Sequence, residues 1–165
     1  MKQQILTVNE FKTHQRRKFA KAKGDAWEEA IGDYLRSLGF AVEVAKPVRT
    51  IMRIRGRSAW RNLKVDYFGC LDVMALHPDK PYFLGIQATT AIGELSRKKA
   101  ALRRVGWNLA ATRPQIWIPE ISTIRDVVGG VIRLVRVVEP IGSPIAAWKE
   151  SVYPLDRGVW MGALR

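Results

Sequence analysis

The sequence contains little cysteine and no long apolar run, and each shortage excludes a class of protein. Cys70 is the single cysteine among 165 residues, which excludes an intrachain disulfide and a multi-cysteine zinc site. No apolar stretch approaches the ~18 residues that a membrane-spanning helix requires. The opening MKQQILTVNEFK has neither the apolar core nor the cleavage site of a signal peptide. We therefore expect a reduced, cytoplasmic protein that does not enter a membrane.

Signatures of two common enzyme chemistries are also missing. The two histidines, His14 and His77, lie in a basic segment and in a turn, without the pattern of a Ser/His/Asp triad. The VGGV segment at 128–131 is more typical of a turn that opens a strand than of a glycine-rich phosphate loop. Triad hydrolysis and nucleotide binding by a phosphate loop are therefore not expected.

The sequence is rich in positive charge. There are 28 Lys and Arg against 15 Asp and Glu, a net charge of +13, and the hydrophobic fraction of 47% is typical of a globular chain. Such an excess attracts polyanions and accelerates their capture. Because the cations are clustered in a few segments, we favour nucleic acid as the partner over an indifferent basic surface.

The pattern of elements predicts an α/β protein of one domain. Residues 1–23 form a basic N-terminal arm or helix, and residues 24–165 form the domain, with its core motifs at 24–119. A helix that Asp25 caps and Gly39 ends is followed by successive strands, a basic helix and the apolar strand PQIWIP. The expected strands lie at 40–46, 48–64 (a hairpin), 65–76 and 82–90, the basic helix at 92–105, and later strands at 114–119 and 129–138. This order predicts a central mixed β-sheet flanked by helices.

Polar residues on neighbouring elements suggest a metal site. Glu28 lies on the border of an apolar helical face, where a carboxylate is costly without compensation. Asp72 stands between two apolar residues of a strand, and Gln87 and Thr89 project from one face of the next strand. Oxygen ligands from adjacent strands and a nearby helix are what Mg²⁺ requires. A metal held there would activate water and stabilise charge on a phosphate.

Each of these residues also has an ordinary structural interpretation. Glu28 could form an ion pair at the helix edge, or Glu29 could point inward in its place. Asp72 could accept hydrogen bonds from a turn, and Gln87 could form a cross-strand hydrogen bond with a neighbour. Asp66 is a weaker candidate ligand, because an ideal strand separates it from Asp72 by roughly 20 Å unless a bulge near Gly69 bends the chain.

Three segments together resemble the PD-(D/E)xK nuclease superfamily, which has the restriction-endonuclease-like fold. The segments are GDAWEEAIGDYLRSLGF, GCLDVMAL and YFLGIQATT, followed by a basic helix. The resemblance covers about residues 24–105, with PQIWI as the expected later strand of an αβββαβ core. The pattern is most similar to small Holliday-junction-resolvase-like and phage-type nucleases.

This resemblance implies both a reaction and a set of ligands. Glu28, Asp72, Gln87 and the backbone carbonyl of Ala88 would hold Mg²⁺, for which Mn²⁺ could substitute. The expected activity is that of an endonuclease hydrolysing phosphodiester bonds in double-stranded or branched DNA, such as Holliday junctions. A homodimer is expected because cutting two strands symmetrically calls for two sites. The resemblance also fits a bacterial or phage-encoded protein.

One position departs from the family pattern. Thr89 stands where the family normally places a lysine that orients water and stabilises developing charge. Lys98 or Lys99 of the basic helix, or Lys64 of the hairpin, could supply the missing cation. Without a replacement, the chain would be a catalytically weak or inactive nucleic-acid-binding module on the same fold.

Nucleic acid is expected to bind along the basic hairpin and the basic helix. Trp60, within the hairpin, could stack on a base. The candidate contacts are Arg53, Arg55, Arg57, Arg61 and Lys64 in the hairpin and Arg97 and Arg103 in the helix.

Overall fold

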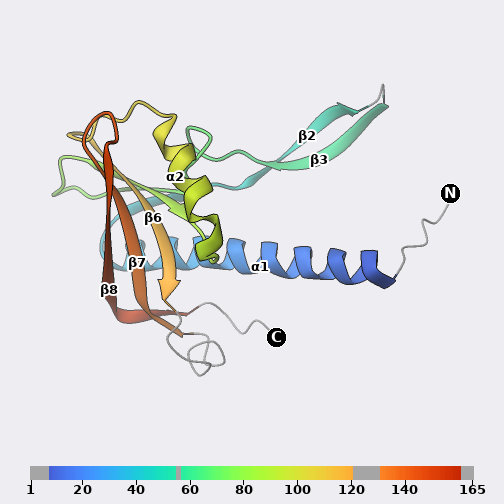
Figure 1. Cartoon of the computed structure of the whole chain (residues 1–165), viewed down its shortest axis with the longest axis horizontal. Coiled ribbons are helices and arrows are strands. Elements are labelled where there is room, and N and C mark those ends of the chain that lie inside the picture. Colours follow the sequence, from blue (N-terminus) through green and yellow to red (C-terminus); the bar gives the residue numbers. More distant parts are fainter. Residues whose placement is uncertain (1–7, 55–56, 121–130, 161–165) are drawn as a thin grey trace.

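The computed structural model describes residues 8–54, 57–120 and 131–160, which form two α-helices, one 3-10 turn and eight strands (Figure 1). The elements are α1 (Val8–Ser37), β1 (Ala41–Val44), β2 (Pro47–Ile54), β3 (Arg57–Lys64), β4 (Val73–Leu76), β5 (Phe83–Ala88), η1 (Ile92–Glu94), α2 (Leu95–Arg103), β6 (Thr112–Glu120), β7 (Val131–Ile141) and β8 (Ala147–Trp160).

Six of the strands form one mixed sheet in the order β1-β4-β5-β6-β7-β8. The pair β5–β6 is parallel and is connected through α2, whereas every other neighbouring pair is antiparallel. The predicted α/β class and the central mixed sheet with helices packed on it are therefore confirmed. β7 and β8 extend the sheet beyond β6, and β8 lies in a region for which the sequence had suggested no element.

The two helices cover opposite faces of this sheet. Trp27, Ile31 and Leu35 of α1 are fully buried against one face, in a cluster with residues of β4, β5, β6 and β7. Leu102 of α2 is buried against the other face, together with Ile116 and other apolar residues. Each sheet face thus packs against one helix.

α1 is longer than predicted. The helix runs without a break from Val8 to Ser37, across the expected boundary between residues 23 and 24. Asp25 therefore does not cap a helix, and that prediction is wrong. A glycine inside a helix costs only about 1 kcal/mol relative to alanine, so Gly24 does not stop helix-forming residues on both sides.

The C-terminal end of α1 is where the sequence predicted it. Gly39 has a φ of +88°, a left-handed conformation that glycine adopts without steric cost. The Phe40 amide donates to the Leu35 carbonyl at 3.1 Å, and the Gly39 amide donates to the Arg36 carbonyl at 3.0 Å. These bonds satisfy the last helical carbonyls and direct the chain into β1.

The predicted long strand over residues 65–76 does not exist. Phe68 and Gly69 both have positive φ, at 53° and 70°, and they reverse the chain in a tight turn. Tyr67 and Leu71 then form an isolated antiparallel bridge, in which each amide donates to the other residue's carbonyl. The strand proper is only Val73–Leu76. Gly69 provides the turn, because its backbone conformation is one that most side chains disfavour.

β2 and β3 pair only with each other, as a two-stranded sheet. Figure 1 shows this hairpin and the N-terminal half of α1 both projecting beyond the main sheet on the same side. An isolated two-stranded hairpin is marginal in water, and the exposed Val48, Ile51 and Trp60 contribute no buried core to it.

None of the helices in the described part of the chain is long and apolar enough to cross a membrane.

Candidate metal and nucleic-acid site

Most of the buried polar side chains lie where β4 begins and β5 ends. Within the described part of the chain, the buried polar or charged residues are Glu28, Asp72, Gln87, Thr89 and Thr112. The first four are the residues from which the sequence predicts a site. Burying so many polar groups in one place is costly unless each is satisfied, which makes this location unlike the apolar core around it.

Asp72 and Gln87 lie against each other. The Gln87 side-chain amide donates to Asp72 Oδ2 at 2.5 Å, and the backbone amide of Ala88 donates to the same oxygen at 2.8 Å. The Asp72 amide donates to the Ile86 carbonyl at 2.8 Å, just beyond the Val73–Ile86 pair, and this bond holds Asp72 beside the end of β5. Two donors thus fix the orientation of a carboxylate that is only 3% exposed.

The backbone carbonyl of Ala88 belongs to the same location. The amide and carbonyl of one strand residue project to the same side of the strand. Because the Ala88 amide points to Asp72, its carbonyl also projects toward the β4 side. The structure therefore brings Asp72, Gln87 and Ala88 together on adjacent strands.

Glu28 approaches this location from α1. Trp27, immediately before it, donates its indole N–H to the Trp117 carbonyl at 3.2 Å, and the Thr89 amide donates to that same carbonyl at 3.1 Å. The helix is thereby attached at the end of β5. Glu28 is 9% exposed, whereas Glu29 faces solvent, so Glu28 is the inward carboxylate of the pair.

Asp66 lies nearer to Asp72 than an ideal strand would allow. The turn at Phe68–Gly69 folds the chain back, and the Tyr67–Leu71 bridge leaves Asp66 and Asp72 as the residues that flank it on the outside. Both carboxylates now lie near Cys70, because both raise the pKa of its thiol. The turn at Phe68–Gly69 is the bend near Gly69 that the prediction named as its exception, so the separation of an ideal strand does not apply.

The two candidate lysines of α2 point to different partners. Lys99 Nζ lies 2.9 Å from a Glu150 carboxylate oxygen on β8 and 5.6 Å from the centroid of the Trp148 ring. Lys98 is half-buried, and its charge acts instead on Cys70. Burial, with the Asp66 and Asp72 carboxylates nearby, raises the pKa of the Cys70 thiol to about 11, and the Lys98 ammonium opposes that rise. Lys98 also shares the face of α2 that carries Leu95 and Leu102, which pack in one cluster with Cys70 and Leu71, next to Asp72 in the chain.

Thr89 has a structural role in the turn after β5. Its hydroxyl donates to the Ala91 carbonyl at 3.3 Å and accepts a hydrogen bond from the Ala91 amide at 3.2 Å. The side chain is 6% exposed. Position 89 thus holds the chain as it leaves the strand, and any cation for this site comes from another element.

The donor set matches the preference of a hard divalent cation, which binds carboxylate, amide and carbonyl oxygens. Asp72, Gln87 and the Ala88 carbonyl come from paired strands, and Glu28 comes from the helix. Among the residues that the structure describes, no group of three or more His, Cys, Asp or Glu side chains is arranged to hold a metal. A cation here would therefore depend on the Gln87 side chain, on the Ala88 carbonyl and on water as well as on the carboxylates. The Gln87 amide would then turn so that Oε1 faces the ion.

The predicted nucleic-acid contacts fall on two surfaces. Arg53 lies in β2, and Arg57, Arg61 and Lys64 lie in β3, although their side chains fall outside the described part of the structure. Arg55 also lies outside the described residues. On α2, Arg97 bonds to Glu94 at 2.9 Å and Arg103 packs over Trp148 with the guanidinium carbon 5.6 Å from the ring centroid.

The hairpin also presents a contact that the sequence did not predict. The guanidinium carbon of Arg49 lies 4.8 Å from the centroid of the Trp60 ring, within the range of a cation–π contact. Trp60 is 59% exposed. Trp60 pairs with Ile51 and Arg49 pairs with Asn62, so Arg49 and Trp60 are diagonal neighbours across the two strands. Knowledge of this register would have predicted their contact.

No protein-family model, no curated protein and no solved structure matches this chain.

Proposed function

We propose that this protein is a metal-dependent endonuclease of the PD-(D/E)xK type, with a restriction-endonuclease-like fold, that hydrolyses phosphodiester bonds in double-stranded or branched DNA. One observation carries the proposal: in a chain of net charge +13, buried Asp72 and Gln87 bond to each other at the end of β5, beside the point where Trp27 attaches α1, the helix that carries the buried Glu28. Without its hairpin, the order of elements from α1 to β6 is helix, three strands, helix and strand, as the αβββαβ core requires.

The ligands of the proposed metal are Asp72, Gln87, the Ala88 carbonyl and Glu28. When bound, Mg²⁺ or Mn²⁺ lowers the pKa of a coordinated water and neutralises charge on the scissile phosphate. Asp72 provides the central anionic oxygens, which the Ala88 amide holds in orientation. Glu28 adds a second carboxylate from a helix that the Trp27 indole attaches to the end of β5.

Lys98 provides the positive charge that the family's motif lysine normally provides at the position of Thr89. It shares the face of α2 that carries Leu95 and Leu102, which pack with Cys70, whereas Lys99 is engaged by Glu150. A fixed ammonium near the scissile phosphate stabilises the charge that develops in the transition state. The reach of a lysine side chain from the next helix thus offsets the neutral threonine at position 89.

DNA binds on the two basic surfaces, those of the hairpin and of α2. The cations of the hairpin neutralise phosphates, and the exposed Trp60 with Arg49 over its ring provides a platform for an unpaired base. A two-stranded ribbon also fits the width of the major groove. A homodimer would place a second site against the opposite strand.

One observation favours a second candidate function, that of a nucleic-acid-binding module without activity. Gln87 donates its amide hydrogen to Asp72 at 2.5 Å, so the carboxylate is satisfied by the protein itself. With Thr89 committed to a turn, the site would then be a buried polar network that stabilises the strand ends.

Cleavage and binding assays separate the two functions. A labelled four-way junction, a linear duplex and a single strand are incubated with the protein in Mg²⁺, Mn²⁺ or EDTA. Metal-dependent cleavage that Asp72→Ala abolishes, with binding retained, supports the nuclease. Tight, salt-sensitive binding without cleavage in either metal supports the binding module, and absence of binding at moderate salt contradicts both.

A further inference from the structure

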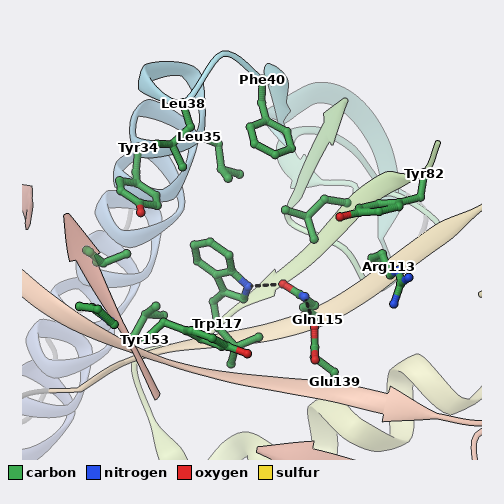
Figure 2. A pocket seen from close by; sticks show the side chains of 15 residues that line it. Tyr34, Leu35, Leu38, Phe40, Tyr82, Arg113, Gln115, Trp117, Glu139 and Tyr153 are labelled. Carbon is green, nitrogen blue, oxygen red and sulfur yellow. Dashed lines mark hydrogen bonds between the residues drawn. The ribbon is translucent and has the colours of Figure 1, made fainter. Parts of the chain in front are cut away.

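A cavity of about 510 Å³ lies on the face of the sheet that α1 covers, between the C-terminal part of α1 and strands β5 to β8 (Figure 2). Its volume is within the range of small-molecule sites. Five aromatic rings line it, those of Tyr34, Phe40, Tyr82, Trp117 and Tyr153. The described residues of its lining include none of the proposed metal ligands. It adjoins the start of β5, whereas the metal ligands adjoin the end.

The cavity wall carries a carboxylate held in a fixed position. The Trp117 indole donates to Gln115 Oε1 at 2.7 Å, and Gln115 Nε2 donates to a carboxylate oxygen of Glu139. An indole N–H can only donate and a carboxylate can only accept, so the Gln115 amide has one possible orientation. Figure 2 shows Trp117, Gln115 and Glu139 in this order along the wall.

A cation lies beside this carboxylate on the same face of β6. Arg113 is two residues before Gln115, and its guanidinium carbon is 4.9 Å from the centroid of the Tyr82 ring. Arg113 and Glu139 line the same cavity, on either side of Gln115, which bonds to Glu139. The Arg113 guanidinium, which only donates hydrogen bonds, and the Glu139 carboxylate, which only accepts them, thus both line the cavity among its aromatic rings.

We propose that this cavity binds an unpaired guanine base. Guanine presents acceptors at O6 and N7, which a guanidinium engages with two hydrogen bonds. It also presents two adjacent donors, N1–H and N2–H₂, which match the two oxygens of a carboxylate. Adenine and cytosine each present a single exocyclic amino donor, so neither base provides Glu139 with that pair. The rings of Tyr34, Tyr82 and Tyr153 provide apolar and stacking contacts to the base.

The base comes from a free nucleoside or from a nucleic-acid strand, and only the second source rests on the proposed nuclease function. In a strand, a guanine in this cavity would anchor the DNA on the α1 face, away from the metal ligands. The cavity would then select substrates with an unpaired guanine at a set distance from the cut.

The test uses the full-length protein and uncharged nucleosides, which avoid non-specific capture of phosphate by a basic chain. Guanosine, inosine, adenosine and cytidine are titrated by calorimetry, and single strands of thymine with one internal guanine or adenine form a second arm. We expect guanosine to bind about tenfold more tightly than inosine, which lacks the 2-amino donor. Glu139→Gln should remove that preference, and Arg113→Gln, at an exposed position, should weaken guanosine binding without changing the melting temperature.

Asp72→Ala is the matched control, because it should abolish cleavage and leave guanosine affinity unchanged. A protein that binds guanosine but cuts no DNA would contradict the nuclease and leave the guanine site standing. Binding of guanosine but not of the guanine-containing strand supports the site and identifies the free nucleoside as its ligand. No saturable binding of guanosine, or equal affinity for guanosine and inosine in the wild type, would overturn the proposal.

Discussion

Replacing Lys98 and Lys99 separately with methionine tests which cation serves the site. Methionine keeps most of the apolar stem of lysine and removes only the charge. Lys98 acts on the thiol of Cys70 beside the carboxylates, whereas Lys99 contacts Glu150 at 2.9 Å. The two variants are therefore a matched pair, with adjacent residues on one helix and the same change of charge.

The structure sets the expected size of each effect. Loss of one preorganised charge that stabilises a transition state typically costs about 10²–10³ in rate, so Lys98→Met should slow single-turnover cleavage by about 100-fold or more. The Lys99–Glu150 pair is partly exposed, at 21% and 38% for the two side chains. Such a pair contributes no more than about 1 kcal/mol, so Lys99→Met should lower stability slightly and leave the cleavage rate unchanged.

A readout independent of catalysis checks where Lys98 lies. The Lys98 ammonium lowers the pKa of Cys70, so its removal should raise that pKa further, and Lys99→Met should leave it unchanged. The pH dependence of the alkylation rate of Cys70, the single cysteine, measures this pKa. Equal effects of the two variants on cleavage, or an unchanged Cys70 pKa in Lys98→Met, would refute the assignment of Lys98.

Three further predictions concern Gln87, Trp60 and Cys70. Gln87→Glu replaces the donor 2.5 Å from Asp72 by a second carboxylate, so unfolding in EDTA should become easier by roughly 2 kcal/mol or more, increasingly so at higher pH, and millimolar Mn²⁺ should restore the melting temperature; an unchanged melting temperature in EDTA would contradict this. Trp60→Ala, at a side chain that is 59% exposed, should weaken single-strand binding about fivefold or more with an unchanged melting temperature; unchanged binding by titration would remove Trp60 from the interface. Because the folded Cys70 thiol has a pKa of about 11 and the unfolded thiol about 9, the free energy of unfolding should fall as pH rises from 9 to 11; a Cys70→Ala variant that loses as much stability over this range would show another group to be responsible.

Helical spacing was sufficient to predict several positions. The spacing of Trp27, Ile31 and Leu35 correctly predicted the buried face of α1, and with it the inward position of Glu28. The strand predicted at 82–90 is present as β5, Phe83–Ala88, but residues 84–88 are all buried, so its two faces do not differ in exposure. The helical pattern succeeds because it follows from the period of a single element and the apolar face that it buries.

The incorrect predictions all concern how elements begin, end or turn. Asp25 has the chemistry of a helix cap, but a capping side chain does not interrupt a helix whose preceding residues are also helical. The apolar residues around Gly69 predicted one long strand. The turn there depends on the backbone angles of two residues, which the amino-acid composition indicates only weakly. That turn decides the distance from Asp66 to Asp72.

The cavity, β8 and the partners of the lysines depend on contacts between distant segments. Arg113 and Gln115 alternate with Pro114 and Ile116 on β6, and Glu139 follows Val138 on β7, so these polar positions within apolar strands were visible in the sequence. The pairing that aligns the two strands was not visible, and it is what brings Gln115 to Glu139. The prolines and glycines after residue 139 concealed β8, and with it Glu150, the partner of Lys99.

Single-turnover cleavage by Asp72→Asn tests the central claim most directly. Asparagine keeps an oxygen to accept from Gln87 and Ala88, so the variant should fold and bind a four-way junction and a duplex as the wild type does. The wild type should cut at least one of these substrates in Mg²⁺ or Mn²⁺ and not in EDTA, while Asp72→Asn should cut neither. Cleavage by the variant at the wild-type rate, or no cleavage by a wild type that binds both substrates tightly, would contradict a metal-dependent nuclease centred on Asp72.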